Sequence, residues 1–184
     1  MLKRNKPDCA DLIAKAKLGN SDAFADIIKQ YYGLVMHYLL GMGVKHSDAE
    51  DVAQEAFITL FRKIDQVTNP ATFTAWLLRI SRNLFIDKIR KEKKIDVSGN
   101  QFELELLTSN LTPESEVVSN SEVSDIFAGL KSRERVILEL RVFQNMSFAE
   151  IGEVQGMTEG NVRLVFHRLI SKLRDRLAKE FGRL

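Results

Sequence analysis

The chain is poor in cysteine and has no long apolar run. Its single cysteine, Cys9, cannot form a disulfide within the chain and supplies too few thiolates for a zinc cluster. No stretch of about 18 apolar residues occurs, which argues against a membrane-spanning helix. The basic N-terminus also lacks the apolar core of a secretory signal. We therefore expect a reduced, cytoplasmic protein that does not insert into a membrane.

Signatures of catalysis are missing as well. The sequence contains no phosphate-binding loop, no GxGxxG fingerprint and no nucleophile motif. His37, His46 and His167 lie far apart and have no metal-ligand spacing with acids or with Cys9. We expect no catalytic residues, no metal and no cofactor, so an enzyme is the least favoured class.

Charge is strongly segregated along a chain whose net charge is only +2. Residues 1–95 carry sixteen basic and eleven acidic side chains, and residues 131–184 carry eleven basic and seven acidic ones. The intervening residues 96–130 carry seven acids and no base. Two basic blocks around an acidic segment suggest that both ends bind a polyanion, while the middle avoids or mimics nucleic acid.

Apolar periodicity predicts helices nearly everywhere outside the middle of the chain. Ser21 is the expected cap of the long second helix, and Ser47 with Glu50 forms the expected capping box of the third. Phe61 is assigned to the buried stripe of that third helix. The predicted helices are 8–18, 21–42, 47–64, 69–94, 121–130, 132–143, 147–155 and 158–180.

Residues 96–120 are predicted to be a flexible linker, because Ser, Asn, Gly and acids dominate and periodicity is weak. Four apolar residues within 102–107 either dock on another surface or form a short strand or helical turn. The predicted fold is all-α, with an N-terminal domain at 1–95 and a C-terminal helix-turn-helix domain at 121–184. Such a linker permits a compact autoinhibited form as readily as an open one.

A helix-turn-helix is predicted between Ser147 and Arg176. Ser147 and Glu150 form a capping box, Gly156 suits the turn, and Thr158 opens a second helix with an apolar face and a basic outer face. This pattern indicates binding to duplex DNA, although a plain helical hairpin with a solvated basic face remains the alternative.

Two residues depart from a typical helix-turn-helix. Gly152 stands where alanine is usual, at some cost in helix propensity. Gln155 occupies a position where an apolar side chain usually closes the angle between the helices. These departures leave the packing of the turn open.

A second basic element lies at 79–94, where seven Lys or Arg residues outnumber two acids. Such a helix can neutralise several phosphates, although basic residues also favour helix C-termini in general. Phe73 and Trp76 precede it and could stack on unpaired bases, while Trp76 taken alone is more typical of a core. The polar loop at 66–72 could receive an extruded base.

The order of these elements resembles bacterial sigma factors of the small, extracytoplasmic-function type over about residues 22–177. The resemblance rests on DAEDVAQEAFITLFRKI, on FTAWLLRISRNLFIDKIRKEKK, and on the segment from Leu130 to Leu177 that contains the helix-turn-helix. It implies a protein that binds core RNA polymerase and directs promoter-specific initiation by reading the −35 element as duplex and the −10 element as melted DNA. It also implies an anti-sigma protein as a candidate partner.

The resemblance assigns three sets of binding residues. The set for the clamp helices of the polymerase large subunit is Asp48, Glu50, Asp51, Gln54, Glu55 and Ile58. The −10 set is Asn69, Thr72, Phe73, Trp76, Arg79, Arg82, Asn83, Lys88, Arg90 and Lys91. The −35 set is Glu159, Gly160, Asn161, Arg163, Leu164, His167, Arg168, Lys172 and Arg174.

Alternatives remain at this point. The acids of the first set could simply be favourable charges at a helix N-terminus. A stand-alone regulator that binds duplex DNA as a dimer would explain the helix-turn-helix, but it would leave the acidic helix and the Trp76 helix without a role. A helical protein that binds polymerase without reading DNA is a third reading.

Overall fold

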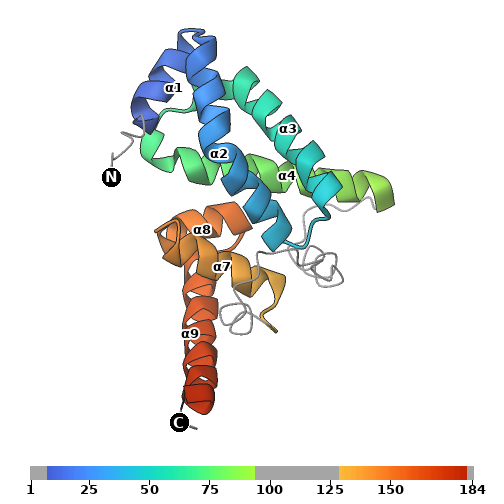
Figure 1. Ribbon diagram of the computed structural model, residues 1–184, viewed down its shortest axis with the longest axis vertical. Coiled ribbons are helices and arrows are strands. Elements are labelled where there is room, and N and C mark those ends of the chain that lie inside the picture. The colour runs from blue at the N-terminus through green and yellow to red at the C-terminus, as the bar shows by residue number, and fades with distance from the viewer. Residues whose placement is uncertain (1–7, 94–128, 182–184) are drawn as a thin grey trace.

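The computed structural model describes residues 8–93 and 129–181, and all regular secondary structure in these ranges is helical (Figure 1). This confirms the predicted all-α class. The predicted linker at 96–120 and residues 121–128 of the next predicted helix lie outside the described residues. Gly129 and Leu130, which that prediction included, are not helical. The elements are α1 (Cys9–Lys17), α2 (Ser21–Gly41), α3 (His46–Lys63), η1 (Ile64–Gln66), η2 (Pro70–Thr72), α4 (Phe73–Lys93), α7 (Ser132–Val142), α8 (Phe148–Gln155) and α9 (Glu159–Phe181).

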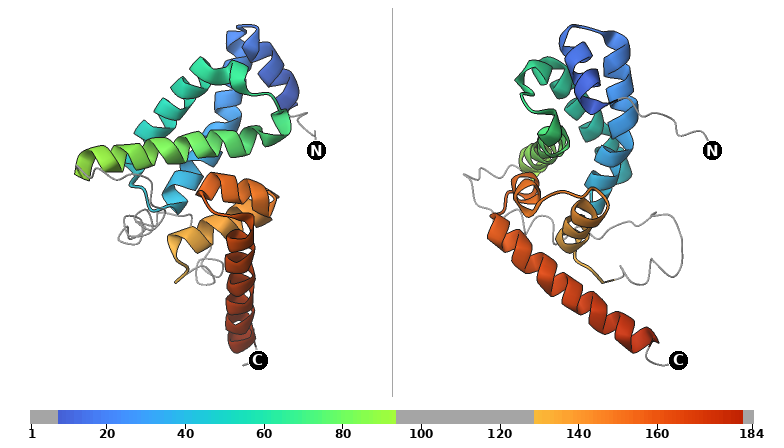
Figure 2. Two further views of the ribbon diagram at one scale, coloured as in Figure 1. Left: turned by 180° about the vertical axis from the view of Figure 1, so that it is seen from behind. Right: turned by 90° about the vertical axis from the view of Figure 1, so that its left-hand side faces the viewer.

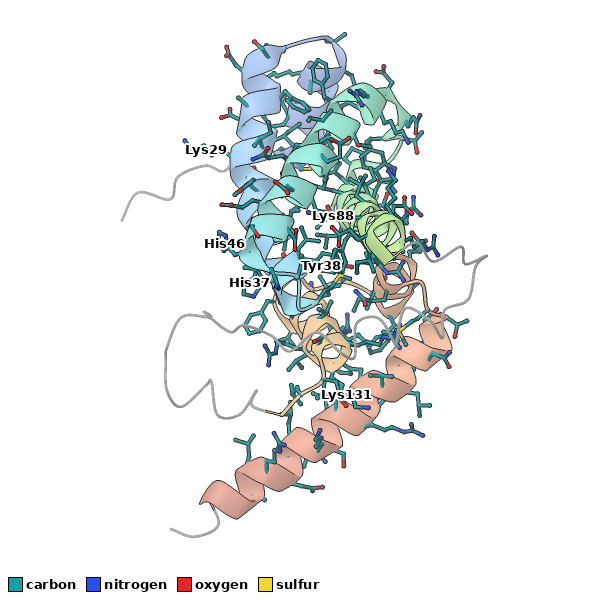
Figure 3. The ribbon with its side chains drawn as sticks, turned by 90° about the vertical axis from the view of Figure 1, so that its right-hand side faces the viewer. Lys29, His37, Tyr38, His46, Lys88 and Lys131 are labelled. Carbon is teal, nitrogen blue, oxygen red and sulfur yellow. The ribbon has the colours of Figure 1, made fainter. Side chains whose placement is uncertain are left out.

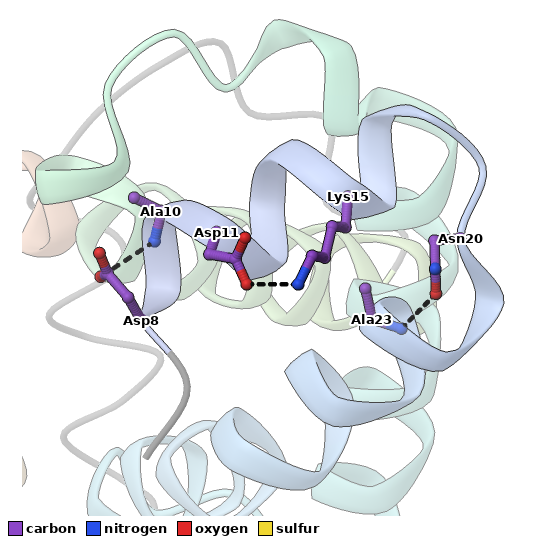
Figure 4. A network of polar contacts seen from close by, with 6 residues as sticks. All are labelled: Asp8, Ala10, Asp11, Lys15, Asn20 and Ala23. Atoms are coloured by element: carbon purple, nitrogen blue, oxygen red, sulfur yellow. Dashed lines mark hydrogen bonds and ion pairs between the residues drawn. The ribbon is translucent and has the colours of Figure 1, made fainter. Parts of the chain in front are cut away.

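The first two helices are capped by side chains that accept from backbone amides (Figure 4). Asp8 accepts from the N–H of Ala10, and Asn20 accepts from the N–H of Ala23 at 2.9 Å. The prediction that Ser21 caps α2 is therefore wrong by one residue. Asn20 has the extended backbone of a cap, whereas Ser21 is already in the helix.

The predicted capping box of α3 is also wrong. The helix begins at His46 after Lys45, and no side chain caps it. Ser47 therefore lies inside the first turn, where its backbone is helical and its hydroxyl is not placed as a cap. Glu50 instead lies beside His46, with 3.7 Å between Oε1 and Nδ1.

The N-terminal half packs around side chains that α2, α3 and α4 contribute together. Leu39, Leu60 and Leu77 are completely buried, and burial of such side chains contributes roughly 1.5–3 kcal/mol each. Ser81, also completely buried, donates to the carbonyl of Leu77 and so satisfies its hydroxyl within α4. Half-buried Cys9 accepts a hydrogen bond from the Tyr31 hydroxyl at 3.0 Å.

The helix-turn-helix follows its sequence pattern closely, which confirms that prediction. Ser147 and Glu150 form the reciprocal capping box of α8. Gly156 turns the chain in the left-handed region, with φ 64° and ψ 38°, a conformation that costs glycine little. Thr158 then accepts from the N–H of Asn161 at the start of α9. Val162, on the predicted apolar face, is completely buried.

Gly152 is required by the close approach of the turn, rather than being a tolerated weakness. A Cβ at this position would lie 2.7 Å from the backbone oxygen of Met157, closer than Cβ atoms approach other atoms. Because Gly152 has no Cβ, α8 can pack directly against the segment that leads into α9, and this packing is gained at some cost in helix propensity.

Replacing Gly152 with alanine should lower the free energy of unfolding by about 1–3 kcal/mol, because the backbone of the turn must shift to make room. Denaturant unfolding followed by circular dichroism measures this difference. Gly160→Ala is the matched control, because a Cβ there meets nothing within 4 Å. That control should be neutral or stabilising by up to about 1 kcal/mol. Equal stability of the two variants would contradict the prediction.

The two halves of the chain pack against each other. Helix α8 lies along α4, and α7 lies against the end of α2. Helix α9 packs against α8 and α7, and its C-terminal end projects beyond them (Figures 1 and 2). Ile137, Leu140, Ile151 and Val154 belong to one continuous buried cluster with residues of α2 and α4. Of the two arrangements that the sequence allows, the structure is thus the compact one.

Candidate polymerase and DNA interfaces

One side of α3 is acidic and exposed. Asp51, Gln54, Glu55 and Ile58 recur every three or four residues, and all four face solvent. Ile58 is 44% exposed, and Phe61, one turn further on, is 65% exposed. We call these five residues the α3 face. Large apolar side chains that stay exposed among charges are typical of a surface that binds another protein.

The prediction that Phe61 belongs to the buried stripe is wrong. Phe57, Leu60 and Ile64 complete that stripe at helical spacing, and Phe61 is turned about 100° away from Leu60. Its ring packs edge-on against Phe24, with 5.1 Å between centroids. The spacing alone could have placed Phe61 on the α3 face next to Ile58.

Asp48 and Lys88, predicted for different partners, bind each other. The Lys88 Nζ lies 2.6 Å from Asp48 Oδ1 and 3.2 Å from Asp51 Oδ2 (Figure 3). The hydrogen bond to Asp48 raises the pKa of Lys88. This pair ties α4 to the first turns of α3 and partly neutralises Lys88 as a phosphate ligand.

Phe73 is removed from the candidate DNA surface because its side chain is completely buried. Its ring packs edge-on against Tyr31 at 5.0 Å and lies nearly parallel to Trp76, with 6.4 Å between centroids. Trp76 itself is only partly buried. Of the two aromatic residues, only Trp76 therefore has accessible ring surface, and Phe73 packs against it from the core.

The basic and polar side chains of α4 point in different directions. Arg79, Asn83 and Lys91 are exposed, whereas Arg90 lies 3.7 Å from Asp87 on the same helix. Arg82 is on the side that faces α8. There, a Cβ on Gly156 would lie only 3.0 Å from Arg82 Nη2.

The loop before α4 uses its polar side chains to shape itself. The Asn69 side chain accepts from the N–H of Ala71 at 3.0 Å, and the Thr72 hydroxyl donates to the carbonyl of Asn69 at 3.1 Å. Both side chains remain exposed. These contacts hold the loop as a short 3-10 turn at the N-terminus of α4.

Every residue of the predicted −35 set is exposed on α9. Near the start of the helix, Arg163 Nη2 lies 2.6 Å from Glu159 Oε1, and its guanidinium lies 5.6 Å from the Phe148 ring centroid. Lys172 lies 3.4 Å from the Gly129 carbonyl and 3.7 Å from Glu134, so it is partly engaged within the protein.

No metal or membrane site is found within the described residues. Residues 8–93 and 129–181 contain no group of three or more His, Cys, Asp or Glu placed to hold a metal ion. Among the helices in those ranges, none is both long and apolar enough to cross a membrane.

Comparison with known proteins identifies the family. Residues 27–95 match Sigma-70 region 2, and residues 126–175 match Sigma-70, region 4. The chain is 32% identical over 176 residues to the ECF RNA polymerase sigma factor SigW of Bacillus subtilis, a match that covers 90% of this chain and 94% of SigW. The chain belongs to the ECF RNA polymerase sigma factors. Its function is to direct promoter-specific transcription initiation, and the reading as a stand-alone regulator is not favoured.

A further relative agrees with this assignment, and a solved structure shares the fold. The ECF sigma factor SigE of Mycolicibacterium smegmatis is 31% identical over 158 residues, which cover 84% of this sigma factor and 61% of SigE. The structure of CnrH in complex with the cytosolic domain of CnrY has the same fold, with a TM-score of 0.58 and 24% identity. That match covers 94% of this chain and 97% of CnrH.

An ionic contact joins the two halves of this sigma factor. His37 Nε2 at the end of α2 lies 3.2 Å from Glu139 Oε1 of α7 (Figure 3). The hydrogen bond to Glu139 raises the pKa of His37, against the opposing effect of partial burial. Protonation of His37 therefore strengthens this contact.

The stability supplied by this pair should depend on pH. Because folding raises the pKa of His37, the contribution is complete below the unfolded value of about 6.5 and is lost as the pH rises through the folded value. Since His37 is half exposed, we expect less than about 1 kcal/mol. Denaturant unfolding at about pH 5.5 and pH 8.5 should show this difference in the wild type relative to Glu139→Gln. An identical pH dependence in both proteins would refute it.

Proposed function

We propose that this sigma factor contacts polymerase, −10 DNA and −35 DNA through three separate surfaces and catalyses no reaction of its own. The observation that carries the proposal is that the α3 face, the exposed side of α4 with its preceding loop, and the outer side of α9 are each accessible to solvent. The family function requires three partners, and three exposed surfaces of suitable chemistry are present.

The α3 face suits a basic and partly apolar partner, the clamp helices of the polymerase large subunit. Exposed Asp51 and Glu55 would steer a basic surface toward the helix, because opposite charge accelerates association. Ile58 and Phe61 would then lose their exposed apolar area in the complex. Because Phe61 is exposed next to Ile58, we add it to the polymerase-binding residues predicted from the sequence.

The N-terminus of α4 and its loop suit the melted −10 element. Trp76 offers an aromatic face, which only an unstacked base can meet. Arg79 and Lys91 on the same helix can neutralise phosphates of the strand. Asn69 and Thr72 hold the loop in the shape that would receive an extruded base.

Helix α9 suits the major groove of the −35 element. Its first two turns would present Glu159, Gly160, Asn161, Arg163 and Leu164 to base edges, as recognition helices do. Arg168, Lys172 and Arg174 are further along and would contact phosphates, with His167 beside them. Of these, Lys172 is already partly engaged by Gly129 and Glu134.

The proposal extends to domain organisation, location and control. The two matched regions support an N-terminal domain at 1–95 and a C-terminal domain at 121–184. A sigma factor acts where polymerase is, in the bacterial cytoplasm.

A protein that covered either basic surface would silence it, and we propose an anti-sigma protein as that partner, since CnrH is known in complex with the cytosolic domain of CnrY.

Transcription in vitro tests the proposal directly. Core polymerase would be supplied with a library of genomic fragments, with and without this chain. New start sites that share two spaced upstream sequence motifs are the expected result. Binding to core without any new start would leave a polymerase-binding regulator, and absence of binding to core would reject the proposed α3 contact.

Arg163→Ala should weaken DNA binding in a sequence-dependent way, by about 5- to 150-fold at the −35 element, because contacts to base edges provide about 1–3 kcal/mol of discrimination. Arg174→Ala is the matched variant, since Arg174 is exposed about four turns beyond the start of α9. It should weaken binding to the specific and the scrambled duplex alike, and it should lower the slope of log affinity against log salt concentration by about one. Fluorescence anisotropy with the −35 duplex and with the scrambled duplex measures the affinity of each variant for both sequences. Equal losses on both sequences for both variants would oppose these roles.

A further inference from the structure

The first helix of the chain has no part in the three proposed binding surfaces. Helix α1 lies before residue 27, where the match to Sigma-70 region 2 begins. It packs against α2 and also against η1 and η2, the two short turns between α3 and α4 (Figure 1). Leu12 and Ile13 of α1 belong to the same buried cluster as Val67 of the loop. Helix α1 therefore lies directly against the loop that is proposed to receive an extruded base.

One polar side chain ties α1 to this loop. Lys17 is the last residue of α1, and its Nζ donates to the carbonyl oxygen of Val67 at 2.6 Å and lies 3.5 Å from that of Asp65. The Lys17 side chain is half-buried. Hydrogen bonds from a charged donor are stronger than those between neutral groups. Because both acceptors belong to the main chain, the ammonium group fixes the path of the backbone into the loop.

The two halves of the loop are held in different ways. The N–H of Val67 donates to the carbonyl of Ile64 at 3.1 Å, and the Val67 side chain is buried. The second half is shaped by the contacts of Asn69 described above. These bonds all stay within the segment that joins α3 to α4. The bond from Lys17 connects this segment to a separate helix, so it positions the loop as a whole.

A second series of contacts runs from α1 toward Trp76. The Tyr31 hydroxyl donates to Cys9 of α1, and burial raises the pKa of Tyr31, so the hydroxyl keeps the proton that it donates. The Tyr31 ring packs against Phe73, which lies against Trp76. The loop and the accessible ring of the candidate −10 surface are thus both supported from α1.

We propose that Lys17 is a positioning residue for −10 recognition, which holds the Val67 carbonyl and so keeps the loop at 66–72 in the shape that receives an extruded base. The inference rests on the proposed function of that loop and extends it to a helix outside the matched region. Lys17 acts through the loop and does not contact DNA itself. Its loss should therefore weaken the capture of one base, rather than the general attraction to phosphates.

Lys17→Met tests the role, because methionine retains an unbranched apolar stem and removes the donor. The affinity of the polymerase holoenzyme for a single-stranded −10 oligonucleotide from a mapped promoter should fall at least about fivefold. Lys15→Met is the matched control. Lys15 is on the same helix and pairs with exposed Asp11 at 2.7 Å (Figure 4). Its loss should change the affinity by less than about twofold, and equal losses in the two variants would overturn the proposal.

Oligonucleotides that each lack one base locate the effect. For the wild type, removal of the base that enters the loop should weaken binding at least about fivefold. For Lys17→Met, the same removal should cost about half of that factor or less, because the side chain and the base act on one contact. An unchanged penalty at every position would overturn the proposal.

Salt dependence and a conservative variant separate positioning from direct contact. A lysine that bound a phosphate of a single strand would, when lost, lower the slope of log affinity against log salt concentration by about 0.7. Lys17→Met should leave this slope unchanged. Lys17→Arg keeps a charged donor and should bind within about threefold of the wild type. A lowered slope for Lys17→Met, or an equal loss in Lys17→Arg, would overturn the proposal.

Hydrogen exchange of the free protein tests the anchor without DNA. The N–H groups of Val67, Ala71 and Thr72 are hydrogen-bonded within the loop segment. Lys17→Met should accelerate their exchange at least about fivefold relative to the wild type and Lys15→Met. Unchanged exchange would overturn the proposal. If the wild type does not bind the −10 oligonucleotide, the proposed function of the loop fails, while exchange still decides whether Lys17 orders it.

Discussion

Replacing Ile58 with aspartate should weaken binding to core RNA polymerase by at least about 30-fold. Ile58 is an exposed apolar side chain between Glu55 and Phe61 on the α3 face, and a central apolar anchor typically contributes about 2–4 kcal/mol to an interface. The aspartate would also add a charge that must be desolvated on binding. Titration of labelled sigma factor with core polymerase measures the change.

Leu18→Asp provides the matched control for Ile58→Asp. Leu18 is 88% exposed at the end of α1, outside the α3 face, so the same apolar-to-acid change should leave polymerase affinity within about twofold. A similar loss in both variants would mean that added negative charge, rather than a contact at Ile58, explains the effect.

Trp76→Ala should reduce capture of the melted −10 strand by about 5- to 150-fold, because one stacked base contributes about 1–3 kcal/mol. The affinity for a single-stranded −10 oligonucleotide, measured with the polymerase holoenzyme, reports this directly. Transcription from a double-stranded promoter should fall by a similar factor. Binding to a −35 duplex should not change, because that contact belongs to α9.

Phe73→Ala separates stacking from stability. Phe73 is completely buried between Tyr31 and Trp76, so its truncation should lower the free energy of unfolding by about 3–5 kcal/mol. Trp76→Ala, at a partly buried site, should cost clearly less stability while losing more strand binding. If Trp76→Ala destabilised the protein as much as Phe73→Ala and retained strand binding, Trp76 would be a core residue and not a DNA contact.

The local signals in the sequence were reliable where a helix could be specified by its own residues. Ser147, Glu150 and Gly156 fixed the boundaries of α8, because a capping box and a left-handed glycine act within a few residues of each other. Where two polar residues competed for the same helix start, the choice was missed. Asn20 caps α2 in place of the adjacent Ser21. Helix α3 was missed for another reason, because it begins at His46 without any side-chain cap and Ser47 lies inside its first turn.

The candidate sites were predictable as segments but not residue by residue. Every predicted −35 residue lies exposed on α9, because one helix has one solvent face and its periodicity reveals it. In the −10 set, Phe73 is buried, Arg82 faces α8 and Lys88 binds Asp48. Each of these outcomes depends on a neighbouring helix that the periodicity of α4 does not describe.

The sequence by itself determined the helical class, the family and the two candidate DNA-binding segments, because helix periodicity, capping residues and motif order are encoded within short stretches. Only the tertiary structure decided that the two halves pack together. The partner of Gln155 is Tyr38, 117 residues away, and the reason for Gly152 is the backbone of the turn beyond it. Such contacts depend on how whole surfaces fit in three dimensions, and a helical pattern gives the direction of a side chain but not what it meets.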